Sequence, residues 1–443
     1  MDSTDHAHSL SGQPRLNEGS GATRATRRKV IAASFIGNFT EWFDYAVYGY
    51  LAVVIARVFF PESEHALLQT FALFAVSFLV RPLGGFFWGG LGDRVGRKNA
   101  LAWSILLMAA ATFCIALIPG AATIGVAAPI LLLVFRVIQG FSASGEYAGA
   151  SAFLVEYAPP SKRGMYAAVV PASTAAGLLF GSLLVTLMYA VLTGPQIDSW
   201  GWRVPFLLAG PLGFIGHYIR TRLEDTPEFR KLVAQDVAVE APTKQLLVKH
   251  WRTGVIASGA VLLNAVGFYV ILSYMPTYLS RELGVGETQS FLATTAALVT
   301  YIGFIFGTGA LSDRFGRRPI LLTASALFVV FTVPAFLLLD PDTFLLVVLI
   351  QVVLGGMLSL NDGTLPSFLA ELFPTNVRYS GFAVSFNLSN ALFGGTAPFV
   401  ATWLIGVTGS VLAPAFYLSA AAVVSGIAVL VARETSKEAL RAT

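Results

Sequence analysis

Charge is scarce in this chain of 443 residues, and the scarcity excludes most classes of soluble protein. Only 12% of the residues are charged, whereas a soluble domain carries about 25%. By contrast, 55% of the residues are hydrophobic and the mean hydropathy is +0.70. Most side chains must therefore face lipid or one another, which predicts an all-α membrane protein.

Cysteine and histidine are too few, or too poorly placed, for metal or redox chemistry. The single cysteine, Cys114, excludes an intramolecular disulfide and is expected to pack as a small apolar residue. None of the five histidines lies in the middle of a long apolar run, so a histidine proton relay is not expected. No G-x-x-x-x-G-K-[ST] motif occurs, which argues against ATP hydrolysis. We therefore expect no enzyme, no metal and no cofactor.

Long apolar runs fill most of the chain. Each is about the 20 residues that cross ~30 Å of hydrocarbon. We expect twelve transmembrane helices, at 30–56, 66–91, 99–118, 122–146, 164–191, 204–220, 253–279, 289–311, 319–338, 343–362, 379–406 and 411–432.

The basic residues are distributed as a topology signal. If both termini are cytoplasmic, the outward loops hold only Arg57, Arg203 and Arg281, and two further arginines, Arg81 and Arg136, lie within spans. The remaining Lys and Arg residues lie on the inward side, as the positive-inside rule requires. This predicts a multi-pass membrane protein with both termini cytoplasmic. Because the basic residues form no patch, no nucleic-acid partner is expected despite a pI near 9.1.

A basic, glycine-bearing loop occurs twice. Residues 89–98 and 309–318 both fit G-x-x-x-D-R-x-G-R-[RK], and each joins two apolar runs. A second repeat, at 156–163 and 371–378, places an acidic residue seven positions before an arginine. We expect these residues to form a latch that closes the cytoplasmic side, although they could act only as topology anchors. The gating candidates are Asp93, Arg94, Arg97, Glu156, Arg163, Asp313, Arg314, Arg317, Glu371 and Arg378.

The two repeats divide the chain into pseudo-symmetric halves. We expect a disordered cytoplasmic tail at 1–29, a six-helix half at 30–220, a cytoplasmic linker at 221–252, a second six-helix half at 253–432 and a tail at 433–443. Transporters built from such repeats bind substrate near the midplane, between halves that rock around it.

The first span carries a polar stripe. Helical spacing puts Asn38, Glu41, Asp44, Tyr45 and Tyr48 on one face. Two carboxylates one turn apart in an apolar medium cannot both ionise cheaply, so one of them is expected to hold a proton. Asp44, the deeper of the two, is the first candidate for proton coupling, with Glu41 beside it. The alternative is that both carboxylates only hydrogen-bond to neighbouring helices.

The fourth span carries a second polar group. Gln139 and Glu146 share one helix face, and Arg136 lies one turn further out. A buried guanidinium beside a glutamate suits a substrate carboxylate, which could compete with Glu146. The alternative is a permanent pair between Arg136 and Glu146. We therefore class Arg136, Gln139 and Tyr147 as substrate-binding candidates and Glu146 as a proton-coupling candidate.

Aromatic residues in the first and seventh spans supply a further candidate site. A box of Trp and Tyr rings can hold a quaternary or secondary ammonium through cation–π attraction. Trp42 and Tyr274 are the candidates, together with the polar stripe residues Asn38, Tyr45 and Tyr48. Most aromatic residues in membrane proteins are packing or interfacial residues, which is the alternative for each of these.

The duplicated loop resembles that between the second and third helices of the major facilitator superfamily. The segments around 37–48, 81–85, 139–147, 201–206 and 224–229 are similar to those of its metabolite:proton symporter subgroup. Within the subgroup, 48–50, 273–278 and 373–379 are most similar to the proline/betaine transporters. Arg136 is instead similar to the alpha-ketoglutarate permeases, since the betaine carriers have lysine there. The long C-terminal coiled coil of osmosensing betaine carriers is absent, which puts osmotic activation in doubt.

The resemblance implies a monomeric symporter, driven by a proton gradient, that imports a small organic solute. A zwitterion of the proline or betaine type is favoured, and a dicarboxylate or tricarboxylate is the alternative. A drug:proton antiporter is disfavoured because the fifth span lacks the Gly-Pro pair of the antiporter motif. A non-transporting receptor would need an appended signalling domain, which neither short tail offers.

Overall fold

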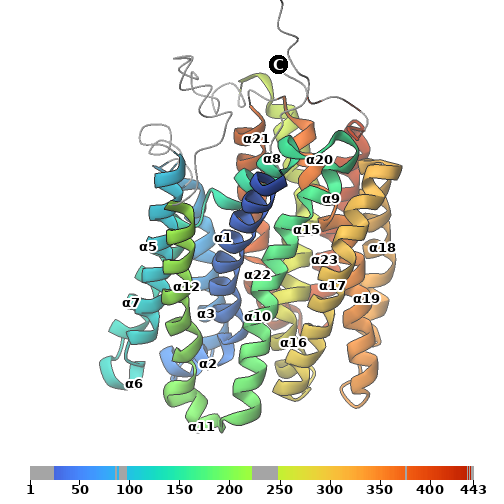
Figure 1. Ribbon diagram of the computed structural model, residues 1–443. Helices are drawn as coiled ribbons and strands as arrows, with labels where there is room; N and C mark the ends of the chain where they lie inside the picture. Colours follow the sequence, from blue (N-terminus) through green and yellow to red (C-terminus); the bar gives the residue numbers. More distant parts are fainter. Residues whose placement is uncertain are drawn as a thin grey trace, which may run out of the picture.

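The computed structural model describes residues 24–84, 87–88, 97–221, 248–374, 377–436, 438 and 440. All regular structure in these residues is helical, and the helices stand side by side in one bundle (Figure 1). The first group of helices comprises α1 (Arg24–Tyr50), α2 (Ala52–Phe59), α3 (Ala66–Leu79), α5 (Arg97–Leu117), α6 (Ala121–Ile124), α7 (Ala127–Ser142), α8 (Glu146–Tyr157), α9 (Arg163–Ala167), α10 (Val169–Val191), α11 (Gly194–Gln196) and α12 (Arg203–Thr221).

The second group follows residue 250. It comprises α15 (Trp251–Tyr269), η3 (Val270–Tyr274), α16 (Met275–Arg281), α17 (Glu287–Phe315), α18 (Arg317–Leu337), α19 (Phe344–Asp362), α20 (Leu365–Leu372), α21 (Arg378–Ser389), η4 (Asn390–Gly394), α22 (Ala397–Thr408) and α23 (Ala413–Val431). The two groups meet where α10 and α9 pack on α17, where α8 packs on α20 and α21, and where α3 packs on α22.

The described helices account for most of the expected spans. Nine of them are long and apolar enough to cross a membrane, and a tenth arises if α1 and α2, bent by 61°, form one broken span. The apolar part of α5, Ala102–Leu117, is shorter, and α12 is not among the nine. The all-helical membrane fold is confirmed, whereas the count of twelve spans stays a prediction.

Two spans continue well beyond the ends that the sequence suggested. The span expected at 122–146 runs over Ala127–Glu156, and the span expected at 343–362 runs over Phe344–Leu372. Each is interrupted, between α7 and α8 and between α19 and α20, by a few non-helical residues. Glu146 and Asp362 lie at these interruptions and were expected at span ends, because a carboxylate normally stops an apolar run. Both are buried in protein, where irregular backbone is tolerated at membrane depth.

Glycine permits the closest helix crossing near the site, between α3 and α7. A Cβ on Gly140 would overlap the backbone carbonyl of Ser77, and a Cβ on Gly84 would overlap that of Phe141. Small residues at such crossings let backbones approach closely in a bilayer. This approach brings the side chains of α3 within hydrogen-bonding reach of α7.

We predict that Gly140→Ala forces α3 and α7 apart. Overpacking of this kind costs about 1–3 kcal/mol, so the thermal unfolding midpoint in detergent should fall by several degrees. Gly303→Ala is the matched control, because a Cβ on Gly303 of α17 meets nothing within 4 Å. Equal midpoints for the two variants would contradict the tight crossing.

Candidate functional site

A chain of hydrogen bonds links α1, α5 and α7 at the centre of the first helix group. The Oγ1 hydroxyl of Thr112 donates to Asp44 Oδ2 at 2.8 Å, and Gln139 Nε2 donates to Thr112 Oγ1. Gln139 Oε1 in turn accepts from Arg136 Nη1 at 2.9 Å. Asp44, Gln139 and Arg136 are all at most 1% exposed. The candidates from the first and fourth spans therefore belong to one network, and Thr112 joins them.

Arg136 is held by neutral groups rather than by Glu146. Its Nη2 donates to Ser77 Oγ at 2.9 Å, and its guanidinium lies 4.1 Å from the centre of the Tyr48 ring. The hydroxyl of Tyr48 donates to the carbonyl of Thr70 at 3.0 Å, which fixes that ring. Glu146 begins α8 and is 8% exposed. The alternative of a permanent pair between Arg136 and Glu146 gains no support from these contacts.

A second buried guanidinium pairs with Glu41. Arg81 Nη2 lies 2.9 Å from Glu41 Oε1, and both side chains are at most 5% exposed. The guanidinium also lies 4.5 Å from the centre of the Tyr45 ring and 5.8 Å from that of Trp42. Breaking a buried pair leaves an uncompensated charge, which typically costs about 3–5 kcal/mol. Glu41 is therefore paired with Arg81, whereas Asp44 accepts a hydrogen bond from Thr112, and proton coupling at either carboxylate stays a prediction.

Asn38 joins α1 to α10. Its Nδ2 donates to Thr174 Oγ1 at 2.7 Å, to Ser173 Oγ at 2.9 Å and to the Val170 carbonyl at 3.1 Å. Three acceptors around one amide nitrogen leave it little freedom to bind substrate. Asn38 therefore holds α1 against α10 and supports the site.

A small cavity lies where the two helix groups meet. It measures about 10 Å³, which is room for about one water molecule. Ring planes from both groups enclose it: Trp42 packs edge-on against Phe268 at 5.2 Å, and Tyr147 stacks on Phe386 at 4.2 Å. Side chains thus fill the centre. The lining residues are Trp42, Tyr147, Pro171, Thr174, Asn264, Phe268, Phe386 and Asn390.

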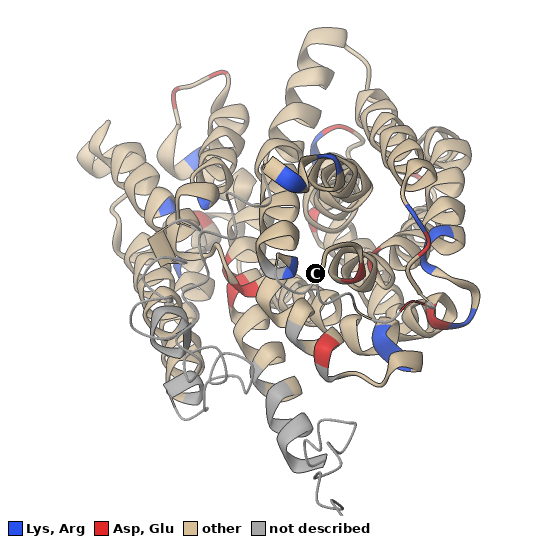
Figure 2. Ribbon diagram, turned by 90° about the horizontal axis from the view of Figure 1, so that it is seen from above, with Lys and Arg blue, Asp and Glu red and all other residues tan. Residues whose placement is uncertain are grey.

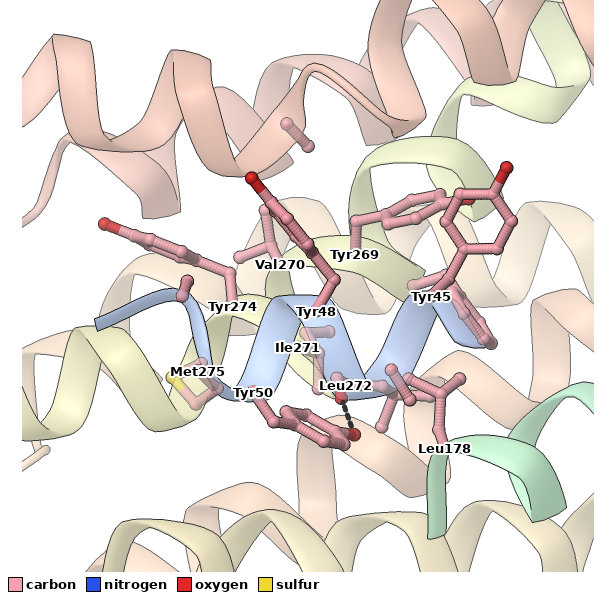
Figure 3. Packing of buried hydrophobic residues seen from close by; sticks show 14 of the residues in the cluster. Tyr45, Tyr48, Tyr50, Leu178, Tyr269, Val270, Ile271, Leu272, Tyr274 and Met275 are labelled. Carbon is pink, nitrogen blue, oxygen red and sulfur yellow. Dashed lines mark hydrogen bonds between the residues drawn. The ribbon is translucent and has the colours of Figure 1, made fainter. Parts of the chain in front are cut away.

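The tyrosines of the seventh span take separate positions (Figure 3). Tyr269 packs against Trp42 and Phe78 near the cavity, with ring centres 5.9 and 5.3 Å apart. Tyr274 lies further along the helix, where its hydroxyl accepts from Thr402 Oγ1 at 3.1 Å. Neither Tyr274 nor Tyr269 is among the cavity-lining residues, whereas Phe268 of the same span lines the cavity. The substrate-binding role of Tyr274 stays a prediction.

The end of the bundle where α8, α9, α20 and α21 meet carries a cluster of ion pairs, and we call it the latch end. Acidic and basic residues are sparse on the described helices and recur at this end (Figure 2). Glu371 Oε1 lies 3.0 Å from Arg317 Nη2 and 3.9 Å from Arg163 Nη1. Arg378 Nη1 lies 3.0 Å from Glu156 Oε1. Two of these pairs, Arg163–Glu371 and Arg378–Glu156, connect the two helix groups.

Asp313 of the duplicated loop also bridges the groups. Its carboxylate accepts from the backbone N–H of Gly164 at 2.8 Å and of Met165 at 3.1 Å, and it pairs with Arg317 at 2.9 Å. Arg314 points elsewhere: it is exposed, with its guanidinium 5.3 Å from the Phe315 ring. The gating role of Arg314 stays a prediction.

The first copy of the loop can be placed only in part. Asp93 and Arg94 lie outside the described residues. Arg97 begins α5, but its side chain is likewise outside the description. The gating role of these three residues stays a prediction.

The segment after α23 reinforces the latch end. Glu434 accepts the backbone N–H groups of Arg317 and Arg318, both at 2.9 Å, and Thr435 Oγ1 donates to Glu371 at 2.8 Å. Burial acts to raise the pKa of Glu434, but the accepted backbone hydrogen bonds outweigh it and the pKa is lowered. Glu434 is thus ionised near neutral pH and caps α18.

Sequence reasoning missed several members of the central site. Ser77, Thr112, Asn264 and Phe386 are small, neutral or aromatic residues without a distinguishing pattern in the sequence. The sequence did contain a signal for the pair of Arg81 and Glu41, because a charged residue within a span is costly unless it has a partner.

We predict that Asp313→Asn weakens closure at the latch end. The amide cannot pair with Arg317 and offers one acceptor oxygen in place of two. With Cys114 replaced by serine, spin labels at the exposed positions Lys162 and Arg314 should move apart by several ångströms in electron-resonance distance measurements. Asp340→Asn is the control, since Asp340 bonds within its own loop at the opposite end. An unchanged label distance would argue against the latch.

Comparison with known proteins agrees with this architecture. Residues 29–247 match the family model "Sugar (and other) transporter", and residues 257–442 match the model "Major Facilitator Superfamily". The chain is 40% identical to the proline/betaine transporter of Escherichia coli (strain K12) over 426 residues, or 94% of this chain and 85% of that protein. It is 39% identical to the glycine betaine/proline/ectoine/pipecolic acid transporter OusA of Dickeya dadantii (strain 3937), with the same coverage.

Solved structures show the same fold at low sequence identity. A crystal structure of a D-xylose-proton symporter superposes with a TM-score of 0.74 at 17% identity, covering 93% of this chain and 99% of that one. The inward-open xylose transporter XylE from E. coli gives a TM-score of 0.67 at 18% identity, covering 93% and 97%. The families matched are transporters and not enzymes. The chain therefore belongs to the major facilitator superfamily.

Proposed function

We propose that this protein is a proton-coupled symporter that imports a small zwitterionic solute of the proline or betaine type. The observation that carries the proposal is the connection of Asp44 to Arg136 through Gln139 and Thr112, beside an aromatic cavity shared by both helix groups. The relatives named for proline and betaine transport support the choice of solute.

Coupling follows from the charges of this network. Ionised Asp44 offsets part of the positive charge of Arg136. When Asp44 binds a proton, that offset disappears, and the Arg136 guanidinium attracts a substrate carboxylate more strongly. Proton and substrate therefore favour each other's binding, which is the requirement for symport.

Alternating access requires that contacts between the two groups open at one end at a time. At the latch end these contacts are the pairs Arg378–Glu156 and Arg163–Glu371 and the hydrogen bonds to Asp313. At the opposite end, the hydroxyl of Tyr50 donates to the Leu272 carbonyl at 2.6 Å, and Ser182 bonds to Thr295 at 2.7 Å. Both sets of contacts are formed among the described residues, so the centre is closed toward both ends and this conformation is occluded.

The remaining parts of the assignment belong to the same proposal. Residues 30–220 and 253–432 act as rocking halves, and 221–252 connects them. The latch end faces the cytoplasm, as the positive-inside rule requires, in a bacterial inner membrane and as a monomer. One proton moving with a neutral solute is worth ~2.3 kcal/mol per 100 mV, which supports roughly 50-fold accumulation.

A dicarboxylate is the second candidate, because the centre contains two buried guanidinium groups, Arg81 and Arg136. Each could bind one carboxylate. The pair of Arg81 with Glu41 at 2.9 Å weighs against this, since substrate would have to displace Glu41.

We predict that Asp44→Asn abolishes proton-driven accumulation of labelled glycine betaine in proteoliposomes, because the amide cannot carry the proton. Exchange of internal for external betaine, which needs no net proton movement, should continue. Asp342→Asn is the control, as Asp342 is exposed in a loop. Accumulation that survives in Asp44→Asn would assign proton coupling to another group.

A further inference from the structure

Asp362 is a buried carboxylate that the proton-coupling network does not use. It ends α19, directly before the interruption at 363–364, and it is 0% exposed. Its Oδ2 accepts from the Tyr301 hydroxyl at 2.7 Å, and its Oδ1 accepts from Asn361 Nδ2 at 2.8 Å. The side chain of Asn264 also lies close to this carboxylate. Three neutral groups thus surround this acid.

The described residues supply Asp362 with no cation. Glu41 has Arg81, Glu371 has Arg317, and Asp44 feels the charge of Arg136. Among the described residues, those that act on Asp362 include Asn264, Asn361, Tyr301 and Tyr147, none of which is basic. A buried carboxylate in an apolar medium attracts a positive charge strongly, because little solvent screens it.

One layer of side chains separates Asp362 from the aromatic cavity. Asn264 lines the cavity, and its side chain lies close to the Asp362 carboxylate. Tyr147 also lines it and feels the Asp362 charge. Phe268, a third lining residue, has its ring 6.3 Å from that of Tyr301, which donates to Asp362. The acid therefore acts on the side of the cavity formed by the second helix group.

The opposite side of the cavity faces the two buried arginines of the first helix group. Trp42 lines this side, and Arg81, which is paired with Glu41, has its guanidinium 5.8 Å from the Trp42 ring. The Tyr45 ring packs on Trp42 at 6.1 Å, and the guanidinium of Arg136 lies 5.3 Å from that Tyr45 ring. The aromatic rings of Trp42, Tyr147, Phe268 and Phe386 lie between the two charged ends. The order of a carboxylate, aromatic walls and an arginine matches the charges of a molecule with an ammonium group and a carboxylate, and the cavity of about 10 Å³ must widen to admit such a molecule.

We propose that Asp362 determines substrate specificity by recognising the positive pole of the zwitterion, while the arginines of the first helix group attract its carboxylate. This inference rests on the proposed zwitterion transport and names the residue that selects the substrate class. A quaternary ammonium has no N–H to donate, so it is held by the field of Asp362 and by the aromatic faces. The same field repels a second carboxylate, which disfavours dicarboxylates.

The test compares glycine betaine with 3,3-dimethylbutanoate, in which a neutral carbon replaces the ammonium nitrogen at nearly the same shape. Each compound competes with labelled betaine for exchange in proteoliposomes. The wild-type protein should prefer betaine by roughly 10-fold or more, as expected for a close pair of opposite charges. Asp362→Asn should lose most of this preference, because betaine should compete less well while the neutral analogue competes equally well or better. Asp362→Glu, which keeps the charge, should retain the preference.

Three results would overturn the inference. Equal loss for both compounds in Asp362→Asn would show a structural role only. Loss of proton-driven accumulation with unchanged discrimination would make Asp362 a proton carrier. If the wild-type protein transports betaine but both compounds compete equally well, recognition of the ammonium charge is excluded. This result does not depend on whether the variants fold. If the wild type transports no zwitterion but takes alpha-ketoglutarate, the proposed function itself fails, and the inference fails with it.

Discussion

The cost of placing charge in an apolar medium shapes this protein more than any other constraint. An ionisable group within a span costs roughly 2.5–3.5 kcal/mol on insertion scales. The chain therefore contains few such groups and gives each a defined environment. Arg81 has Glu41, Arg136 has Gln139 and Ser77, and Arg317 has Glu371. A proton or a substrate that enters the centre changes this balance of charges, and the helices must respond to it.

The position of each pair decides whether it is permanent or has to break. Arg81–Glu41 lies within the first helix group and can persist through a rocking motion. Arg378–Glu156 and the hydrogen bonds of Asp313 to Gly164 and Met165 connect the two groups, so they must open when the latch end opens. In the proposed mechanism, proton coupling at Asp44 and opening at the latch end thus use different side chains of one bundle, and substrate binding between the groups links them.

Much of the fold could be predicted from the sequence, because hydropathy and the duplicated loop both depend on the bilayer. The polar stripe of α1 was also predictable, since it depends only on helical spacing. Long-range partners could not be predicted, because nothing in the local sequence indicates that Asn38 bonds to Thr174 or that Asp44 bonds to Thr112. The predicted span ends at Glu146 and Asp362 were wrong for a related reason. In the sequence, a carboxylate that is buried inside the protein cannot be told from one that ends a span.

The account depends most on a zwitterion being carried with protons. The most direct measurement is uptake of labelled glycine betaine into proteoliposomes under an inward proton gradient, with excess unlabelled proline or alpha-ketoglutarate as competitor. We expect gradient-dependent uptake that proline blocks and alpha-ketoglutarate does not. Absence of betaine uptake, with gradient-driven uptake of alpha-ketoglutarate in its place, would contradict the account and make Arg136 the first residue to mutate in a carboxylate carrier.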